Sequence, residues 1–279
     1  MNKLHELIKL NLGNQNQYVS IHTENTDKPI LLFLHGGPGS AQIGFIRYYN
    51  KPLESEFIVV NWDQKGSGKS YSSGIEAATM TIDQFVLDTI ELTEYLIKRF
   101  DKQKIYLCGH SWGTILGIKT ITKRPELFEA YIGIGQVVNM IEGEKISRQY
   151  SFQSALENNN KKALKELDSI GLPPYKDIKS LFTSRKWLEF YGGATYQSGP
   201  IRLILKGISL KEYNIWDWVY KFIKGSMFSI KLLIAEMYKV NLDKTNLEFN
   251  VPIYFFLGKK DYQVPSELAI KYFDQIKAP

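Results

Sequence analysis

Apolar residues in this chain gather in short, uninterrupted runs that are typical of buried strands. Five such runs occur, at residues 30–34, 57–60, 105–108, 130–134 and 251–257. Residues 4–22 add two further predicted strands around a turn at 13–16. Strands that are apolar on both faces belong in a parallel sheet covered by helices. The pattern therefore predicts an α/β fold with right-handed crossovers.

Helical patterns alternate with these strands. A capping box at residues 81–84 begins one helix, and its apolar stripes continue to about residue 99. A second helix follows Ser111 and ends before Pro125, and a third begins with Pro265. The alternation supports the α/β prediction.

Residues 137–245 interrupt the alternation. They show helical patterns at 148–157, 161–169, 215–223 and 229–238, and no convincing strand. We expect a helical insertion between two strands of one sheet. The predicted domains are a core of residues 1–136 and 246–279 and an inserted helical lid of residues 137–245.

The composition is that of an ordinary globular protein. The 279 residues are 44% hydrophobic and 23% charged, which excludes disordered, collagen-like and coiled-coil chains. A single cysteine, Cys108, excludes an internal disulfide and a cysteine-rich metal site. No run approaches the roughly 18 uncharged apolar residues of a membrane span. We expect a cytoplasmic protein that does not engage a membrane.

The net charge of +6 has a local origin. The segment 137–245 holds 17 basic and 11 acidic side chains, and the rest of the chain is balanced. The basic residues are spaced out, which favours a solvated helical surface over a polyanion site. We expect no nucleic-acid partner.

The candidate nucleophile is Ser111, in the sequence Gly109-His110-Ser111-Trp112-Gly113. Gly-Xaa-Ser-Xaa-Gly alone is a weak signal, and a chance glycine-rich turn is the alternative. Here a predicted strand ends just before the motif and a predicted helix starts at Trp112. This context predicts a tight strand-to-helix turn that exposes the serine hydroxyl.

A second glycine-rich turn, His35-Gly36-Gly37-Pro38-Gly39, follows the first buried strand. Such a turn can offer backbone N–H groups to an oxyanion without an obstructing side chain. We expect the oxyanion hole to consist of the N–H groups of Gly37 and Trp112. We interpret His35 as structural, with hydrogen bonds to the loop.

These motifs resemble the α/β-hydrolase superfamily, and within it the prolyl iminopeptidase-like serine peptidase branch. That branch carries His-Gly-Gly-Pro-Gly, then Asp-Gln-Arg-Gly-Xaa-Gly-Xaa-Ser, then Gly-Xaa-Ser-Trp-Gly. This chain has Asp-Gln-Lys at 63–65, so Lys65 departs from the usual Arg. The resemblance implies a serine hydrolase without metal or cofactor, with Ser111 as nucleophile and Asp261 as the acid that orients a histidine.

The histidine of that triad should follow Asp261, yet residues 262–279 contain none. We expect that this chain is a truncated version of a longer hydrolase. It would lack the last strand and helix and would be inactive. A base supplied by another polypeptide and a ligand-binding pseudoenzyme are the alternatives. Because such an ending leaves a bare sheet edge, we also expect a homo-oligomer or an aggregation-prone monomer.

The substrate class rests on the resemblance alone. It favours release of an N-terminal residue, often proline, from short peptides, with lid carboxylates holding the free amine. Glu212 and Glu236 are the lid candidates. A carboxylesterase, amidase or carbon-carbon bond hydrolase is the enzymatic alternative, and a non-catalytic binding protein on the same fold is the other.

Overall fold

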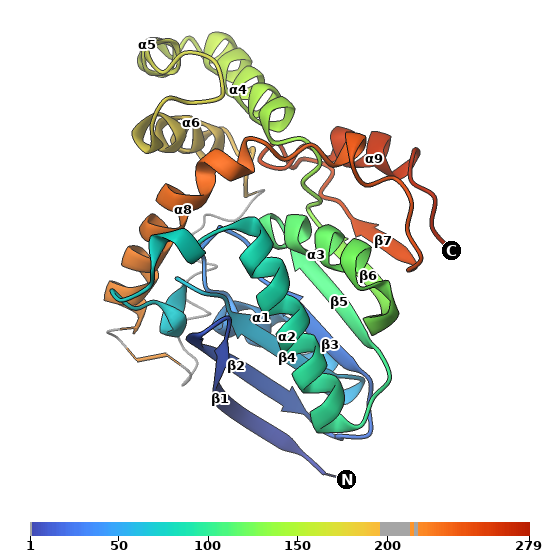
Figure 1. Ribbon diagram of the computed structural model, residues 1–279. Coiled ribbons are helices and arrows are strands. Elements are labelled where there is room, and N and C mark those ends of the chain that lie inside the picture. The colour runs from blue at the N-terminus through green and yellow to red at the C-terminus, as the bar shows by residue number, and fades with distance from the viewer. Residues whose placement is uncertain (1, 196–212, 215–216) are drawn as a thin grey trace.

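The computed structural model describes residues 2–195, 213–214 and 217–279 (Figure 1). Its strands are β1 (Leu4–Leu12), β2 (Gln15–Thr23), β3 (Ile30–Leu34), β4 (Ile58–Asp63), β5 (Ile105–His110), β6 (Phe128–Ile134) and β7 (Ile253–Phe256). Its α-helices are α1 (Ile43–Asn50), α2 (Ile82–Phe100), α3 (Trp112–Lys123), α4 (Met140–Glu157), α5 (Lys161–Ser169), α6 (Ile178–Phe190), α8 (Ile223–Met237) and α9 (Ser266–Phe273). Five 3₁₀ turns (Lys51–Ser55, Gly68–Ser70, Ala77–Thr79, Pro125–Leu127, Leu242–Lys244) and a π-helical turn, η5 (Asp217–Phe222), complete the described elements.

The seven strands form one mostly parallel sheet in the order β1-β2-β4-β3-β5-β6-β7. The β1-β2 hairpin is antiparallel, as is the β2-β4 pair, and every pair from β4 to β7 is parallel. All seven predicted strands are present, and the α/β prediction is confirmed. Parallel strands place their carboxyl ends at one edge of the sheet, where loops and ligands of such folds gather.

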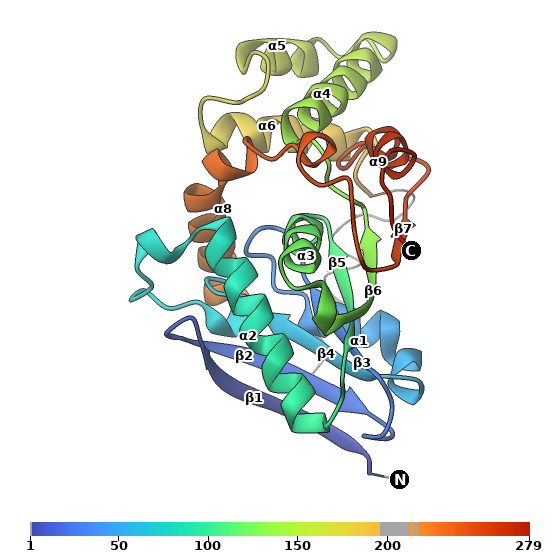
Figure 2. The same ribbon diagram turned by 45° about the vertical axis from the view of Figure 1, so that its right-hand side comes forward.

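Both faces of the sheet are buried, which explains the uninterrupted apolar runs. On one face Leu32, Leu107 and their neighbours pack with buried residues of α2 and α3. On the other, Leu31, Phe33 and Cys108 pack with Ile46 of α1. Figure 2 shows α1 on the opposite side of the sheet from α2 and α3.

The predicted helix boundaries are close to the observed ones in the core. The Thr81 hydroxyl accepts a hydrogen bond from the Gln84 N–H and caps α2, as the capping box predicts. Helix α3 begins at Trp112 and ends before Pro125. Helix α9 begins at Ser266, directly after the predicted start at Pro265, and ends at Phe273.

Between β6 and β7 the described residues form α4, α5, α6, η5, α8 and one 3₁₀ turn, and no strand. We call residues 137–245 the insertion. Its helices α4, α5 and α6 lie beyond the carboxyl ends of the parallel strands (Figures 1 and 2). Within the described part of the chain, no helix combines the length and the apolar character that crossing a bilayer requires.

Lys65, which departs from the motif's usual Arg, is a buried cation in the core. Its Nζ lies 3.2 Å from Asp88 Oδ2 in α2, and both side chains are inaccessible to solvent. Asp88 also accepts hydrogen bonds from Gln17 and Gln84. The lysine therefore has the carboxylate partner that a buried charge requires.

Strand β7 lies at the edge of the described sheet, where it pairs with β6 alone. Tyr254 and Phe256 on this strand are 56% and 61% exposed. An apolar edge strand is a template for pairing with another chain.

We therefore expect the 279-residue polypeptide to associate as its concentration rises, as measured by sedimentation velocity. Phe256→Lys should weaken association at least severalfold, because a charge on the edge opposes pairing. Leu172→Lys, at an exposed position in the insertion, is the matched control and should change nothing. A monomer at every concentration would contradict the prediction.

Candidate active site

Ser111 occupies the tight turn between β5 and α3. Its backbone has φ of +51° and ψ of −117°, a conformation that non-glycine residues rarely adopt. The Ser111 N–H donates to the Ile134 carbonyl at the end of β6. Strained backbone of this kind persists only where the surrounding structure fixes it. The predicted strand-to-helix turn is present.

The two glycines of the motif are required by close backbone contacts. A Cβ at Gly113 would lie 2.1 Å from the Leu34 carbonyl oxygen in β3. A Cβ at Gly109 would lie 2.6 Å from the Gly113 carbonyl oxygen. Helix α3 therefore begins directly against the end of β3, closer than any side chain would allow.

This contact brings the His-Gly-Gly-Pro-Gly loop beside the serine. Gly37 has φ of +125°, and it lines the same cavity as Ser111 and Trp112. Trp112 is the first residue of α3, and first-turn N–H groups have no partner within their helix. The placement suits the predicted oxyanion role of Gly37 and Trp112, which stays a prediction.

Gln64, in the loop after β4, links the two glycine-rich turns. Its amide group donates to the His35 carbonyl and accepts from the Trp112 indole N–H. The sequence motif Asp-Gln-Lys marks the position, but the role of Gln64 as a bridge emerges only from the fold.

His35 is fully buried and engaged in the loop. Its Nδ1 lies 2.7 Å from the Gly36 carbonyl oxygen, and its Nε2 accepts from the Gln64 N–H. Burial lowers the pKa of His35 to about 4, so the ring is neutral at pH 7. These contacts match the structural role expected for this histidine.

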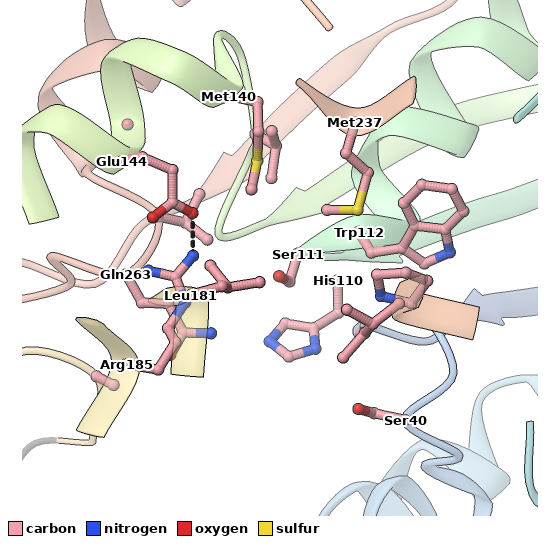
Figure 3. A pocket seen from close by; sticks show the side chains of 18 of the residues that line it. Ser40, His110, Ser111, Trp112, Met140, Glu144, Leu181, Arg185, Met237 and Gln263 are labelled. Carbon is pink, nitrogen blue, oxygen red and sulfur yellow. Dashed lines mark hydrogen bonds and ion pairs between the residues drawn. The ribbon is translucent and has the colours of Figure 1, made fainter. Parts of the chain in front are cut away.

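Ser111 opens into a cavity of about 440 Å³ between the sheet and the insertion. His110 lines the same cavity and lies near Ser111 in Figure 3. Its Nδ1 lies 3.2 Å from Gln42 Oε1, and burial lowers its pKa. Among the described residues, which include all four histidines, no histidine nitrogen is hydrogen-bonded to Ser111 Oγ.

Asp261 lies after β7, beside the carboxyl end of β6. Its Oδ2 would be 3.6 Å from a Cβ at Gly135, the residue that follows β6. Its Oδ1 accepts from the N–H groups of Gln263 and Val264. Burial raises the pKa of Asp261, although these hydrogen bonds and the charge of Arg185 act in the opposite direction. The predicted acid thus lies near the strand-to-helix turn that holds Ser111, which we call the elbow. Its catalytic role stays a prediction.

A partly buried ion pair in the insertion lines the cavity. Glu144 of α4 pairs with Arg185 of α6, and both residues line the cavity (Figure 3). Burial raises the pKa of Glu144, and Arg185 opposes that shift. Within the described part of the chain, Glu144 Oε2 and Arg185 Nη1 have no hydrogen-bond partner. Sequence reasoning did not select either residue.

The two predicted lid carboxylates have different outcomes. Glu236 is not among the residues that line the cavity, and its Oε2 accepts from the Ile82 N–H at the start of α2, at 2.7 Å. Its role as a substrate ligand stays a prediction, but this carboxylate already accepts a hydrogen bond at the N-terminus of α2. Glu212 lies outside the described residues.

The sequence matches the family model described as Serine aminopeptidase, S33, over residues 26–197. The chain belongs to this family. It is 40% identical over 275 residues to the probable aminopeptidase YbaC of Bacillus subtilis (strain 168), a match that covers 97% of this chain and 86% of the relative. It is 30% identical over 206 residues to a proline iminopeptidase of Clostridioides difficile (strain 630), covering 72% of this chain and 66% of the relative.

Solved structures agree on the fold. A proline iminopeptidase-related protein from Thermus thermophilus superposes with a TM-score of 0.66 at 18% identity, over 99% of this chain and 88% of that one. Proline iminopeptidase from Mycobacterium smegmatis superposes with a TM-score of 0.63 at 16% identity, over 98% of this chain and 89% of that one. The α/β-hydrolase fold and the prolyl iminopeptidase-like branch expected from the motifs are thus confirmed.

The close contact between Gly113 and β3 can be tested by substitution. Gly113→Ala should destabilise this serine aminopeptidase family member by about 1–3 kcal/mol or prevent folding, because the new Cβ meets the Leu34 carbonyl. Gly74→Ala is the matched control, since a Cβ there meets no atom within 4 Å. Urea unfolding of both variants provides the measurement. Equal stability of Gly113→Ala and the parent would show that α3 does not need this close approach.

Proposed function

We propose that this protein is a serine aminopeptidase that releases the N-terminal residue from short peptides. One observation carries the proposal: the strained Ser111 opens into a cavity that Glu144 also lines, and Glu144 Oε2 has no hydrogen-bond partner among the described residues. The names of the two relatives, a probable aminopeptidase and a proline iminopeptidase, support it.

In the proposed reaction, Ser111 Oγ attacks the carbonyl carbon of the first peptide bond. A general base removes the hydroxyl proton, and the same group returns it to the leaving amine. The N–H groups of Gly37 and Trp112 donate to the oxyanion that forms. Water then attacks the acyl-enzyme and releases the free amino acid. Asp261 orients the base.

The base does not come from the four histidines of this sequence. His35 is bound into its loop, and His5 and His22 lie in the β1-β2 hairpin. His110 lines the cavity, but its Nδ1 faces Gln42. In the proposal, the base is therefore a group that these contacts do not identify.

Glu144 is the proposed receptor for the substrate's α-ammonium group. Its Oε1 accepts from Arg185, and its buried Oε2 has no hydrogen-bond partner in the described part of the chain. Burial raises the pKa of Glu144, and the adjacent Arg185 guanidinium opposes that rise. A cation that replaced water beside this group would gain a charge-assisted hydrogen bond.

A second candidate function follows from the rest of the cavity wall. Apolar side chains of the insertion, among them Met140, Leu181 and Met237, line the cavity beside Ser111 (Figure 3). Such a wall suits an apolar acyl group. Carboxylester hydrolysis is therefore the alternative, in which Glu144 and Arg185 would hold no ammonium group.

The 279-residue polypeptide should hydrolyse a generic ester slowly. In a comparable triad, loss of the base costs about 10⁶ in kcat, and what remains comes from the oxyanion hole and binding. Steady-state kinetics with an activated aryl ester, compared with Ser111→Ala, provide the measurement. Robust Ser111-dependent turnover would mean that one of the four histidines acts as the base.

Recognition of a free amine can be measured without turnover. We expect prolinamide to bind more tightly than N-acetylprolinamide, and Glu144→Gln to abolish that preference. A hydrogen bond to a charged group contributes about 1.5–3 kcal/mol, which corresponds to a preference of roughly 10- to 150-fold. Isothermal titration calorimetry measures both ligands on both proteins.

Glu142→Gln is the matched control. Glu142 lies half a turn earlier on α4, is exposed and pairs with Lys145. Its substitution should leave the preference unchanged. Equal affinity for both ligands in the unsubstituted protein would contradict the aminopeptidase proposal and favour the esterase.

A further inference from the structure

Two histidines face each other across the β1-β2 hairpin, at the end that carries the chain's N-terminus. The register pairs His5 with His22, so their side chains lie on the same face of the sheet. Their Nδ1 atoms are 2.7 Å apart. His22 is buried, whereas the His5 side chain is 34% exposed.

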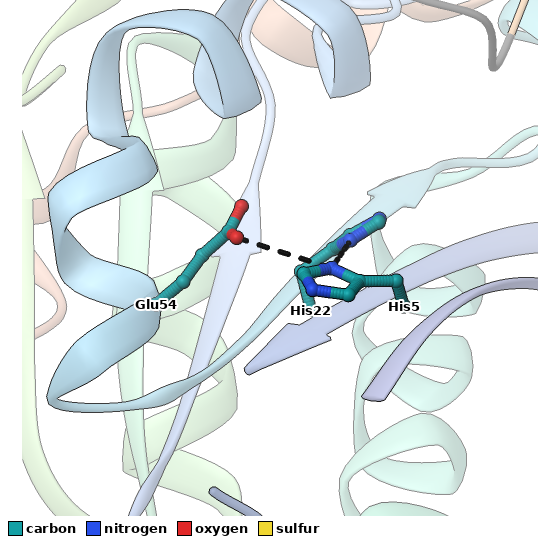
Figure 4. A group of neighbouring side chains, drawn as sticks. All are labelled: His5, His22 and Glu54. Carbon is teal, nitrogen blue, oxygen red and sulfur yellow. Dashed lines mark hydrogen bonds and ion pairs between the residues drawn. The ribbon is translucent and has the colours of Figure 1, made fainter. Parts of the chain in front are cut away.

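A buried carboxylate closes this pair. Glu54 belongs to the 3₁₀ turn Lys51–Ser55, and its carbonyl oxygen accepts from the Glu24 N–H just after β2. Its Oε2 lies 4.0 Å from His5 Nδ1, and its side chain is 4% exposed. His5, His22 and Glu54 each offer one potential ligand atom, and these three atoms lie within 4.8 Å of one another (Figure 4).

We propose that His5, His22 and Glu54 form a binding site for a divalent transition-metal ion, with zinc the best match. Two imidazole nitrogens and one carboxylate oxygen are ligands that zinc prefers, and a water molecule would fill the fourth position. Zinc–ligand bonds of about 2.0–2.2 Å place tetrahedral ligand atoms roughly 3.3 Å apart. To bind one ion, the two nitrogens must separate slightly and the Glu54 carboxylate must approach them, so the His5 and Glu54 side chains must both rotate.

The two facing ring nitrogens are the ligand atoms that an ion would use. The short Nδ1 contact needs a proton on one ring. A bound metal ion would replace that proton at Nδ1. The proton would then move to Nε2 of the same ring.

The surrounding charges both support and limit the site. Glu24 Oε1 lies 4.0 Å from His5 Nε2, the position from which a carboxylate orients a metal-bound imidazole. Arg47 Nε lies 3.7 Å from the other carboxylate oxygen of Glu54, Oε1. The positive charges of Arg47 and Lys3 offset the negative charges of Glu54 and Glu24.

The site would act as a structural link. A bound ion would join edge strand β1 to β2 and to the turn that follows α1, far along the chain from Ser111. It would stabilise the folded state by mass action, because the unfolded chain does not hold the three ligands together.

Zinc chloride titrated into the chelator-treated 279-residue protein tests the proposal by calorimetry and thermal unfolding. We expect one equivalent to bind and Tm to rise by several degrees, reversed by EDTA. His5→Ala should weaken binding about 100-fold or more and abolish the Tm shift. Because His5 is partly exposed, this variant should fold; Glu54→Gln is the second test and should have the same effect.

Glu56→Gln is the matched control, since Glu56 lies beside the same turn but contacts Lys28. It should bind zinc like the unsubstituted protein. Absence of stoichiometric binding would overturn the proposal. So would binding that survives both His5→Ala and Glu54→Gln, which would place the ion elsewhere, for example at His110.

Discussion

The close approach of α3 to the end of β3 organises this molecule. Because Gly113 has no Cβ, helix α3 can start directly against the Leu34 carbonyl at the end of β3. Ser111, which connects β5 to that helix, is then forced to a positive φ. The same contact places the loop after β3 beside the first turn of α3. The nucleophile candidate and the two candidate oxyanion donors thus depend on one backbone contact.

The chemistry of the cavity divides between the sheet and the insertion. The sheet contributes Ser111, Gly37 and Trp112, which are positioned by backbone and by the Gln64 bridge. The insertion contributes the Glu144–Arg185 pair and an apolar wall. In the proposed function the first set performs acyl transfer, and the second selects what reaches it. Substrate choice can then change through the insertion without disturbing the elbow.

The sheet and the elbow were predictable from sequence because their signals are local. Buried parallel strands are apolar throughout, and the glycines around Ser111 report backbone contacts directly. The insertion was harder. The buried face of α4 consists of Gly143, Glu144, Ser147, Ser151 and Ala155, so it shows no apolar stripe. The prediction therefore began this helix at residue 148 instead of 140, and Glu144 fell outside it.

Helix α6 was missed for a related reason, since buried serines interrupt its apolar positions. The His5–His22 pair follows from the hairpin register, but Glu54 reaches it only through the fold. The division into a core and a lid, and the roles of Asp261, Gly37 and Trp112, stay predictions.

The central claim is that Ser111 is the acyl acceptor of this cavity. Prolonged incubation of the 279-residue polypeptide with a fluorophosphonate, followed by peptide mass spectrometry, tests it most directly. The account predicts slow modification at a single position, Ser111, driven by the elbow and the oxyanion donors. Modification of Ser40, which lines the same cavity, or of no serine at all would contradict it.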